Sequence, residues 1–369
     1  MNQATETQPP SQPIHYIHSV YEALKHRQKE VSYPYLMGIS GEAFRLFYYR
    51  FEPEKGMNTF LHNPLRTVCN ALGIKHELLY DETYEAAWER LQANVRIGKP
   101  TLLPFSDCCP FLIAADEPET VICQNGFRYQ FSFKDLQTRW QPIGGFLELG
   151  PYGFYQFVIG DPEREPNPRD TALGAFRCAI KLMRARRRIH NCAMGLVAYE
   201  ELISRLKSLL VSKRKLTVQE IDKATKWSGR PLSQCLEARK AAVEYLQSVR
   251  ERFEGEEAEH LNKAIAAYQK AVTLLNKLQT IWPSTSSLSE PLNSPANPQP
   301  QGQLDLNSSL MPAWGFDQIA DQKTRQKTLK RFKPNCRAAI KLLTKITDAE
   351  TAGVGELENV IRVSEKIKM

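Results

Sequence analysis

The residues with the clearest chemical potential lie at the start of the first segment that is expected to fold. There His18 and Ser19 open a helical pattern, "HSVYEALKHR". A serine at a helix start can act as a nucleophile when a strong base lies beside it. The spacing of Ser19 and Glu22 is also that of a capping box, in which the serine caps the helix and the glutamate returns the hydrogen bond. We predict that Ser19 is a cap, with catalysis as the alternative.

Two further places offer nucleophiles. Ser40 precedes Gly41 in "MGISGEAF", on a turn before an expected helix that Ser40 would cap, again with catalysis as the alternative. Cys108 and Cys109 lie in "FSDCCPF" between two expected strands, and Cys109 is the thiol that we take as a candidate. The neighbouring Asp107 opposes its activation, because a carboxylate raises the pKa of a nearby thiol. We therefore expect the two thiols to be structural.

A serine or cysteine nucleophile also needs a general base, which is most often a histidine. After His76 no histidine occurs until His190, so the expected strand region contains none. His18 is adjacent to Ser19, and neighbouring side chains on a helix point apart. We therefore keep His18 only as a binding candidate.

Anion binding is the second chemistry that the sequence offers. The segment "MRARRRIH" carries four arginines that could grip the phosphate of a nucleic acid or of a pantetheine arm, namely Arg184, Arg186, Arg187 and Arg188. The alternative is a solvated helix face. A second basic segment, 323–337, follows a polar linker and could reach an acidic partner. No P-loop, GxGxxG, HExxH or CxxC motif occurs, so we expect no cofactor and no metal.

Composition excludes several classes of protein. The 369 residues suffice for two ordinary domains, and 42% of them are hydrophobic. No apolar run approaches the roughly 20 residues of a membrane span, and the polar N-terminus has neither the basic nor the apolar part of a signal peptide. Eight scattered cysteines fit reduced thiols. We expect a cytoplasmic protein whose net charge of +8 is spread thinly.

The hydrophobic pattern predicts an α+β fold in the first half of the chain. Expected helices at 19–28, 40–49, 62–73 and 83–96 precede expected strands at 101–105, 110–115, 120–124, 129–133 and 155–160. Helices followed by strands predict helices packed on an antiparallel sheet.

After a Pro-rich hinge at 160–170 the pattern becomes helical. One apolar face runs from Leu261 to Leu278 and another from Leu232 to Val249, which predicts a helical bundle. A basic helix is expected at about 317–347. The predicted organisation is a disordered arm (1–13), an α+β domain (14–160), a helical bundle (161–282), a low-complexity linker (283–310) and a basic helical tail (311–369).

The order of segments resembles a known family. After the His-Ser pair come "YLMGISGEAFRLFYY", "GMNTFLHNPLRTVCNALGIKHEL" and "AAWERLQANVRIGKPTLLPF", an order similar to the butirosin-biosynthesis protein H N-terminal-domain family. The resemblance covers about residues 14–160, with a weaker likeness in the helical part, and 283–369 has no counterpart. It implies a papain-like, bacteriocin-processing-peptidase-like fold and acyl transfer from carrier-protein thioesters to amines. It also implies a His-Cys pair at the first helix, in which Ser19 takes the place of the nucleophilic cysteine.

Three functions remain open. We favour a catalytically degenerate papain-like protein that binds a ligand or a protein, and we lean against an enzyme. A helix N-terminus at Ser19 would favour an acidic or phosphate-bearing ligand, and a carrier protein is the other expected partner. The second possibility is an active acyltransferase, an amide-forming enzyme or a cysteine-peptidase-like hydrolase that uses Ser19, Ser40 or a cysteine. The third is a basic adaptor whose tail recruits an acidic partner or nucleic acid.

Overall fold

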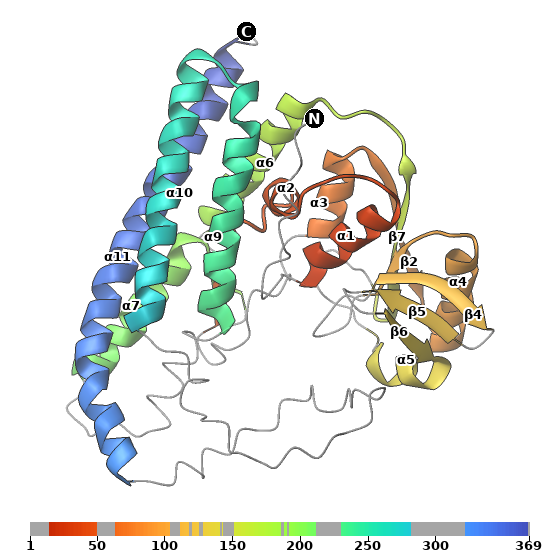
Figure 1. The fold of residues 1–369 in the computed structure, drawn as a ribbon, viewed down its shortest axis with the longest axis horizontal. Coiled ribbons are helices and arrows are strands. Elements are labelled where there is room, and N and C mark those ends of the chain that lie inside the picture. Colours follow the sequence, from red (N-terminus) through yellow and green to blue (C-terminus); the bar gives the residue numbers. More distant parts are fainter. Residues whose placement is uncertain are drawn as a thin grey trace.

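The structure is a computed structural model that describes residues 15–49, 63–103, 111–117, 120–124, 128–140, 142, 151–185, 188–189, 192–211, 230–281 and 322–367. It is mostly helical with antiparallel sheets, so the predicted α+β class is confirmed. Figure 1 shows long helices at one side, the main sheet at the other and short helices between them. The predicted N-terminal arm and low-complexity linker lie outside the described residues. No helix in the described ranges is long and apolar enough to cross a membrane.

The main sheet has six antiparallel strands in the order β2-β7-β3-β4-β5-β6. They are β2 (Ile74–Asp81), β3 (Thr101–Leu102), β4 (Phe111–Glu117), β5 (Thr120–Gln124), β6 (Arg128–Ser132) and β7 (Phe154–Pro162). Five of them fall where the alternating runs predicted strands. β2 was not expected, because as an edge strand it mixes polar Lys75, His76 and Glu77 with its apolar residues.

The two faces of the main sheet contact different parts of the molecule. Along β7, Phe157 and Ile159 join the large core, whereas Phe154 packs on the opposite side. That side is covered by α4 (Tyr84–Arg96) and α5 (Phe133–Arg139), with Trp88 and Trp140 among the buried residues. Successive side chains of a strand point to opposite faces, so β7 separates the two cores.

The N-terminal helices are α1 (His15–His26), α2 (Tyr33–Ile39) and α3 (Pro64–Ala71). The expected helices at 62–73 and 83–96 are confirmed, but the one expected at 40–49 is wrong. Gly41 has a φ of +80° just after α2, and the aromatic residues that follow form β1 (Phe47–Tyr49). β1 pairs with β9 (Cys192–Met194), which also pairs with β8 (Arg188–Ile189). The backbone of the run "FYY" therefore forms its hydrogen bonds within a sheet.

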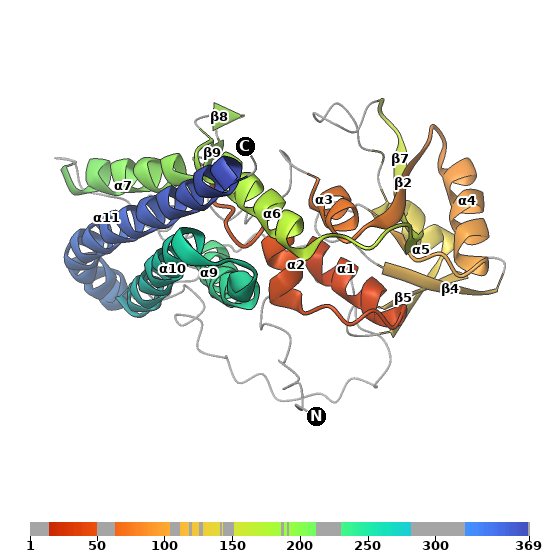
Figure 2. The same cartoon turned by 90° about the horizontal axis from the view of Figure 1, so that it is seen from above.

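The remaining helices form a bundle (Figures 1 and 2). They are α6 (Pro168–Met183), α7 (Leu196–Val211), α9 (Arg230–Val249), the short η2 (Arg250–Arg252), α10 (Gly255–Ile281) and α11 (Gln322–Ile367). The predicted apolar faces of α9 and α10 are buried, as at Leu236, Leu246, Leu261 and Leu275.

The structure differs from the prediction of a separate C-terminal tail. α11 is much longer than the helix expected at about 317–347, and it contacts α10, α7 and α6. Leu343, Ile346, Leu357 and Val360 are buried in it. These apolar positions recur at helical spacing, so α11 is a full member of the bundle.

The largest core does not divide at residue 160. It joins Ile17 of α1 and Phe44 with Tyr245 of α9, Tyr268 of α10 and Val360 of α11. The N-terminal helices thus pack on the bundle as well as on the sheet, and the hinge expected at 160–170 connects two parts of one core.

Candidate functional site

Ser19 lies inside α1 and not at its start. The helix begins at His15, so Ser19 is its fifth residue, and its exposed fraction is 1%. The predicted cap is therefore wrong, and so is the expectation of a nucleophile at a helix N-terminus. The apolar stripe of Ile17, Val20 and Leu24 explains the difference, since all three are buried and Ile17 extends the stripe upstream of the Ser-x-x-Glu pattern.

His18 belongs to a group of half-buried rings that we call the α1–α2 aromatic cluster, defined as His18, Tyr21 and Tyr33. The His18 ring stacks on Tyr21 with centroids 6.3 Å apart and meets the edge of Tyr33 at 6.4 Å. Tyr21 and Tyr33 meet edge to face at 6.1 Å. Burial lowers the pKa of His18, although Glu22 opposes this effect. A neutral imidazole is therefore favoured, which weakens the expectation that His18 binds an anion.

Ser40 is fully buried and serves the backbone around it. Its hydroxyl donates to the carbonyl of Met37 at 3.0 Å and accepts from the amide of Glu42 at 3.2 Å. It follows α2 as the C-terminal cap residue, instead of starting a helix as predicted. Both hydroxyl roles are local, so Ser40 orders the turn.

The two glycines of "MGISG" are required by close packing. A Cβ at Gly38 would lie 2.0 Å from the Tyr245 ring, and one at Gly41 would lie 2.7 Å from Cys178 Sγ. Gly41 also has the positive φ that glycine adopts without strain. The motif that carries the family resemblance is thus the surface on which α6 and α9 pack.

The same segment buries an ion pair. Glu42 and Arg45 have exposed fractions of 0% and 1%, and Arg45 Nη2 lies 2.6 Å from Glu42 Oε2. Burial raises the pKa of Glu42 to about 7, although Arg45 opposes this rise. Arg45 also lies over the Phe47 ring at 4.8 Å. Neither residue was singled out from the sequence.

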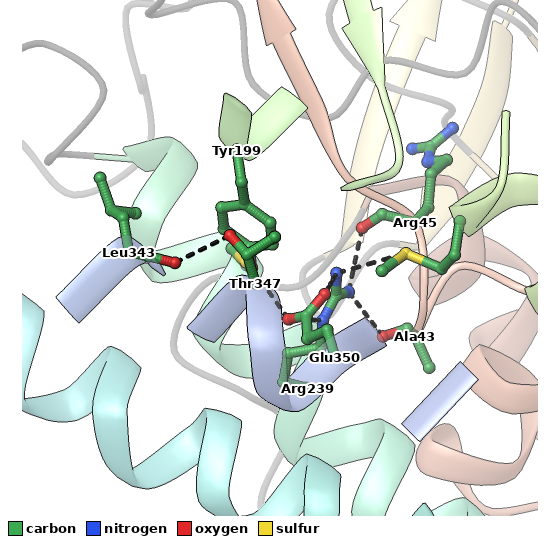
Figure 3. A network of polar contacts seen from close by, with 9 residues as sticks. Ala43, Arg45, Tyr199, Arg239, Leu343, Thr347 and Glu350 are labelled. Atoms are coloured by element: carbon green, nitrogen blue, oxygen red, sulfur yellow. Dashed lines mark hydrogen bonds and ion pairs between the residues drawn. The ribbon is translucent and has the colours of Figure 1, made fainter. Parts of the chain in front are cut away.

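A second buried pair connects this segment to the bundle (Figure 3). Arg239 of α9 grips Glu350 of α11 through two hydrogen bonds of 2.6 and 2.8 Å, and Tyr199 of α7 donates to the same carboxylate at 2.8 Å. Arg239 Nη1 also donates to the carbonyls of Ala43 (2.9 Å) and Arg45 (3.1 Å). One guanidinium therefore holds together the turn after α2, α9 and α11.

A sequence signal for Arg239 was available. It stands between Leu236 and Val243 on the helix face that is otherwise apolar, where a lone charge has to find a buried partner. Glu350 gave no comparable signal, because its place at the centre of the bundle depends on the long-range packing of α11.

The described thiols are poor nucleophiles. Burial raises the pKa of Cys69 to about 12 and that of Cys178, Cys235 and Cys336 to about 11. Cys192 is buried and lies against the carbonyl of Ala193 at 3.6 Å. A raised thiol pKa leaves little thiolate at neutral pH. The candidate Cys109 and its neighbour Cys108 lie outside the described residues.

The arginine cluster is described only in part. Arg184 forms a bidentate pair with Glu358 of α11, at 2.9 and 3.0 Å. Its guanidinium thus has a structural partner, which weakens its role as an anion site. Arg186 and Arg187 lie outside the described residues, and Arg188 is placed only as part of β8. The described ranges also contain no group of three His, Cys, Asp or Glu side chains that could hold a metal ion.

No protein-family model and no curated protein match this sequence. The geometry above brings together Ser40, Glu42, Arg45 and Arg239 around one turn. It leaves Ser19 and His18 in α1. In chemical terms, the turn offers buried ion pairs and backbone hydrogen bonds, whereas the half-exposed rings lie in the α1–α2 aromatic cluster.

Proposed function

We propose that this chain is a catalytically degenerate relative of the papain-like family that it resembles, and that it binds a ligand without turning it over. The observation that carries the proposal is the position of Ser19, the counterpart of the family's nucleophile. It is buried at the fifth position of α1, where the free amides of a helix start are absent. A hydroxyl there has neither the dipole of a helix terminus nor exposure to substrate.

The other described candidates support the same conclusion. The Ser40 hydroxyl forms hydrogen bonds with the backbone of its turn. Burial raises the pKa of the thiols of Cys69, Cys178, Cys235 and Cys336. No histidine occurs between His76 and His190 to act as a base. Loss of a general base alone costs roughly 10²–10⁴-fold in rate.

The surface that we propose for binding is the α1–α2 aromatic cluster. Tyr21 and Tyr33 are half-exposed, and the neutral state of His18 suits a ligand without a negative charge at this place. The family resemblance implies acyl thioesters as ligands, and the alkyl part of an acyl-pantetheine arm can pack on tyrosine rings. We therefore propose the acyl arm of a thioester as the occupant, in place of the phosphate group expected at a helix N-terminus.

Calorimetric titration with an acyl-pantetheine thioester tests the binding surface. We expect Tyr21→Ala and Tyr33→Ala each to weaken binding by about 3- to 10-fold, since an aromatic contact of this kind contributes about 0.5–1.5 kcal/mol. Tyr152→Ala is the matched control, because Tyr152 is 70% exposed and lies beside the main sheet. Equal weakening by the control variant, or no binding by the wild-type protein, would contradict the proposal.

A second candidate function is an enzyme that uses Cys109 or Cys108. The observation that favours it is the contact between α1 and β4, because only Pro110 separates Cys108 and Cys109 in the sequence from Phe111, the first residue of β4. The test is steady-state thioester cleavage by the wild-type protein and by Cys109→Ala and Cys108→Ala. Turnover that one of these variants abolishes would establish this function in place of binding alone.

A further inference from the structure

The charges of the bundle are segregated along its length. From Gln322 to Thr347, α11 contains nine lysines and arginines and no aspartate or glutamate. After Lys263, α10 contains two cations and no acid, and the charged residues of α7 after Glu201 are all cations. We call these three segments together the basic half of the bundle.

The three segments lie at the same end of the bundle. α11 is antiparallel to α7, since Cys336 lies against the carbonyl of Leu206 while Glu350 meets Tyr199. α11 is also antiparallel to α10, since Glu356 meets His260 and Ser364 meets Glu257. In Figure 1 this end is the lower one, where α7, α10 and the first half of α11 lie close together. The cations of the three helices therefore contribute to one electrostatic field.

Three arginines at the opposite end have carboxylate partners. Arg177, Arg184 and Arg169 pair with Glu365, Glu358 and Glu257, which ties α6 to α11 and α10. In the basic half, the exposed side chains of Lys333, Arg337, Lys341 and Lys345 have no carboxylate partner among the described residues. Lys207 of α7 and the α10 lysines Lys270 and Lys277 are exposed in the same way. These charges thus do not hold the described fold together.

The spacing of the α11 cations produces a linear array. Positions 333, 337, 341 and 345 recur every four residues, which places them on one side of the helix about 6 Å apart along its axis. The nine cations from Lys323 to Lys345 extend over about 33 Å, or one charge per roughly 4 Å. A single nucleic-acid strand carries one negative charge per about 3.4 Å. The two charge densities are therefore comparable.

We propose that the basic half of the bundle binds nucleic acid through its phosphate backbone, without reading base sequence. Its exposed cationic side chains are suited to phosphate contacts, which position a nucleic acid and carry no sequence information. An anionic membrane fits less well, because Lys333, Pro334, Arg337, Lys341 and Thr344 present no large apolar side chain for insertion. An acidic protein fits less well, because protein surfaces rarely offer uniform charge over such a length.

The test uses a labelled 30-nucleotide single strand of mixed sequence and the full-length protein, with fluorescence anisotropy at several salt concentrations. The test variant carries Lys333→Gln, Arg337→Gln, Lys341→Gln and Lys345→Gln. The matched control carries Lys75→Gln, Arg96→Gln, Lys99→Gln and Lys134→Gln, which also removes three lysines and one arginine from exposed positions, but at the main sheet. Thermal unfolding of both variants checks that the fold is retained.

We expect the wild-type protein and the control to bind with a steep dependence on salt, and the test variant to bind at least 10-fold more weakly. The slope of log K against log salt should fall by about 2–3 in the test variant, because each lost phosphate contact removes about 0.7. Absence of wild-type binding at 50 mM salt, or equal loss in both variants, would overturn the proposal. Tighter binding of poly-glutamate or of phosphatidylserine vesicles than of the oligonucleotide would overturn it as well. The α1–α2 aromatic cluster takes no part in this binding. Failure of the nucleic-acid proposal would therefore not contradict the proposed function.

Discussion

At the scale of the residue, buried charges dominate the segment that carries the family resemblance. Glu42 and Arg45 are enclosed together, and Arg239 reaches the backbone carbonyls of the same segment. A buried charge destabilises the folded state unless it is paired. Removing one member of a buried pair therefore lowers stability more than removing both members. The side chains around this turn are therefore expected to govern stability, and this expectation can be tested on each pair.

The Glu42 carboxyl should make stability depend on pH. Its pKa is raised by burial from 4.5 to about 7, so the folded state binds more protons than the unfolded state between these values. Stability then falls as the pH rises from about 4.5 to about 7, and this component is constant above that range. Glu42→Gln removes the titrating group. Urea unfolding measures the free energy of unfolding at pH 5 and at pH 8. The decrease from pH 5 to pH 8 should be larger for the wild-type protein than for the variant, and equal decreases would contradict the assignment.

The Arg239–Glu350 pair should show strong coupling. Arg239→Leu leaves the Glu350 carboxylate buried without its guanidinium, which costs about 3–5 kcal/mol. Arg239→Leu combined with Glu350→Leu removes both charges, and we expect the double variant to be more stable than Arg239→Leu alone. Urea unfolding of the two single variants and the double variant measures the coupling. Additive losses would mean that the two side chains contribute independently.

At the scale of the element, the sequence predicted the type of most helices and strands well, but it predicted the first and last residues of some of them poorly. The helices at α3 and α4 and the strand β5 follow from short-range signals, such as the Asn63 cap and the alternation in "TVICQ". At α1 two local signals conflicted, and the buried stripe from Ile17 to Leu24 prevailed over the capping box at Ser19. Tertiary packing decided this case, and no single-sequence rule weighs a cap against a distant core.

Two helical glycines provide a test of the packing at α2. Gly38→Ala places a methyl group against the fully buried Tyr245 ring, and such overpacking typically costs about 1–3 kcal/mol or more. Gly174 of α6 has open space around it, so Gly174→Ala should stabilise by about 0.5–1 kcal/mol through helix propensity. The two substitutions are chemically identical, and urea midpoints should move in opposite directions. A shift of the same sign in both would contradict the contact at Tyr245.

At the scale of the whole molecule, one core joins parts that the sequence presents as separate. The α+β class and the helical second half could be predicted from periodicity and order. The place of α11 could not be predicted, because its many cations indicate a solvated tail, while the partners of its apolar positions lie in distant helices such as α6, α7 and α10. For the same reason the role of the "MGISGEAF" segment was not evident, since its glycines and charges face helices more than 130 residues away.

The central claim is that the chain binds an acyl thioester without cleaving it or accepting its acyl group. Its most direct test is intact-mass spectrometry of the full-length protein after incubation with an acyl-pantetheine thioester, with free thiol release followed in parallel. We predict no acyl adduct on Ser19 or Ser40 and no thiol release above the rate in buffer, although calorimetry under the same conditions detects binding. An adduct that maps to Ser19, Ser40 or Cys109, or thioester cleavage that Cys109→Ala abolishes, would contradict the claim.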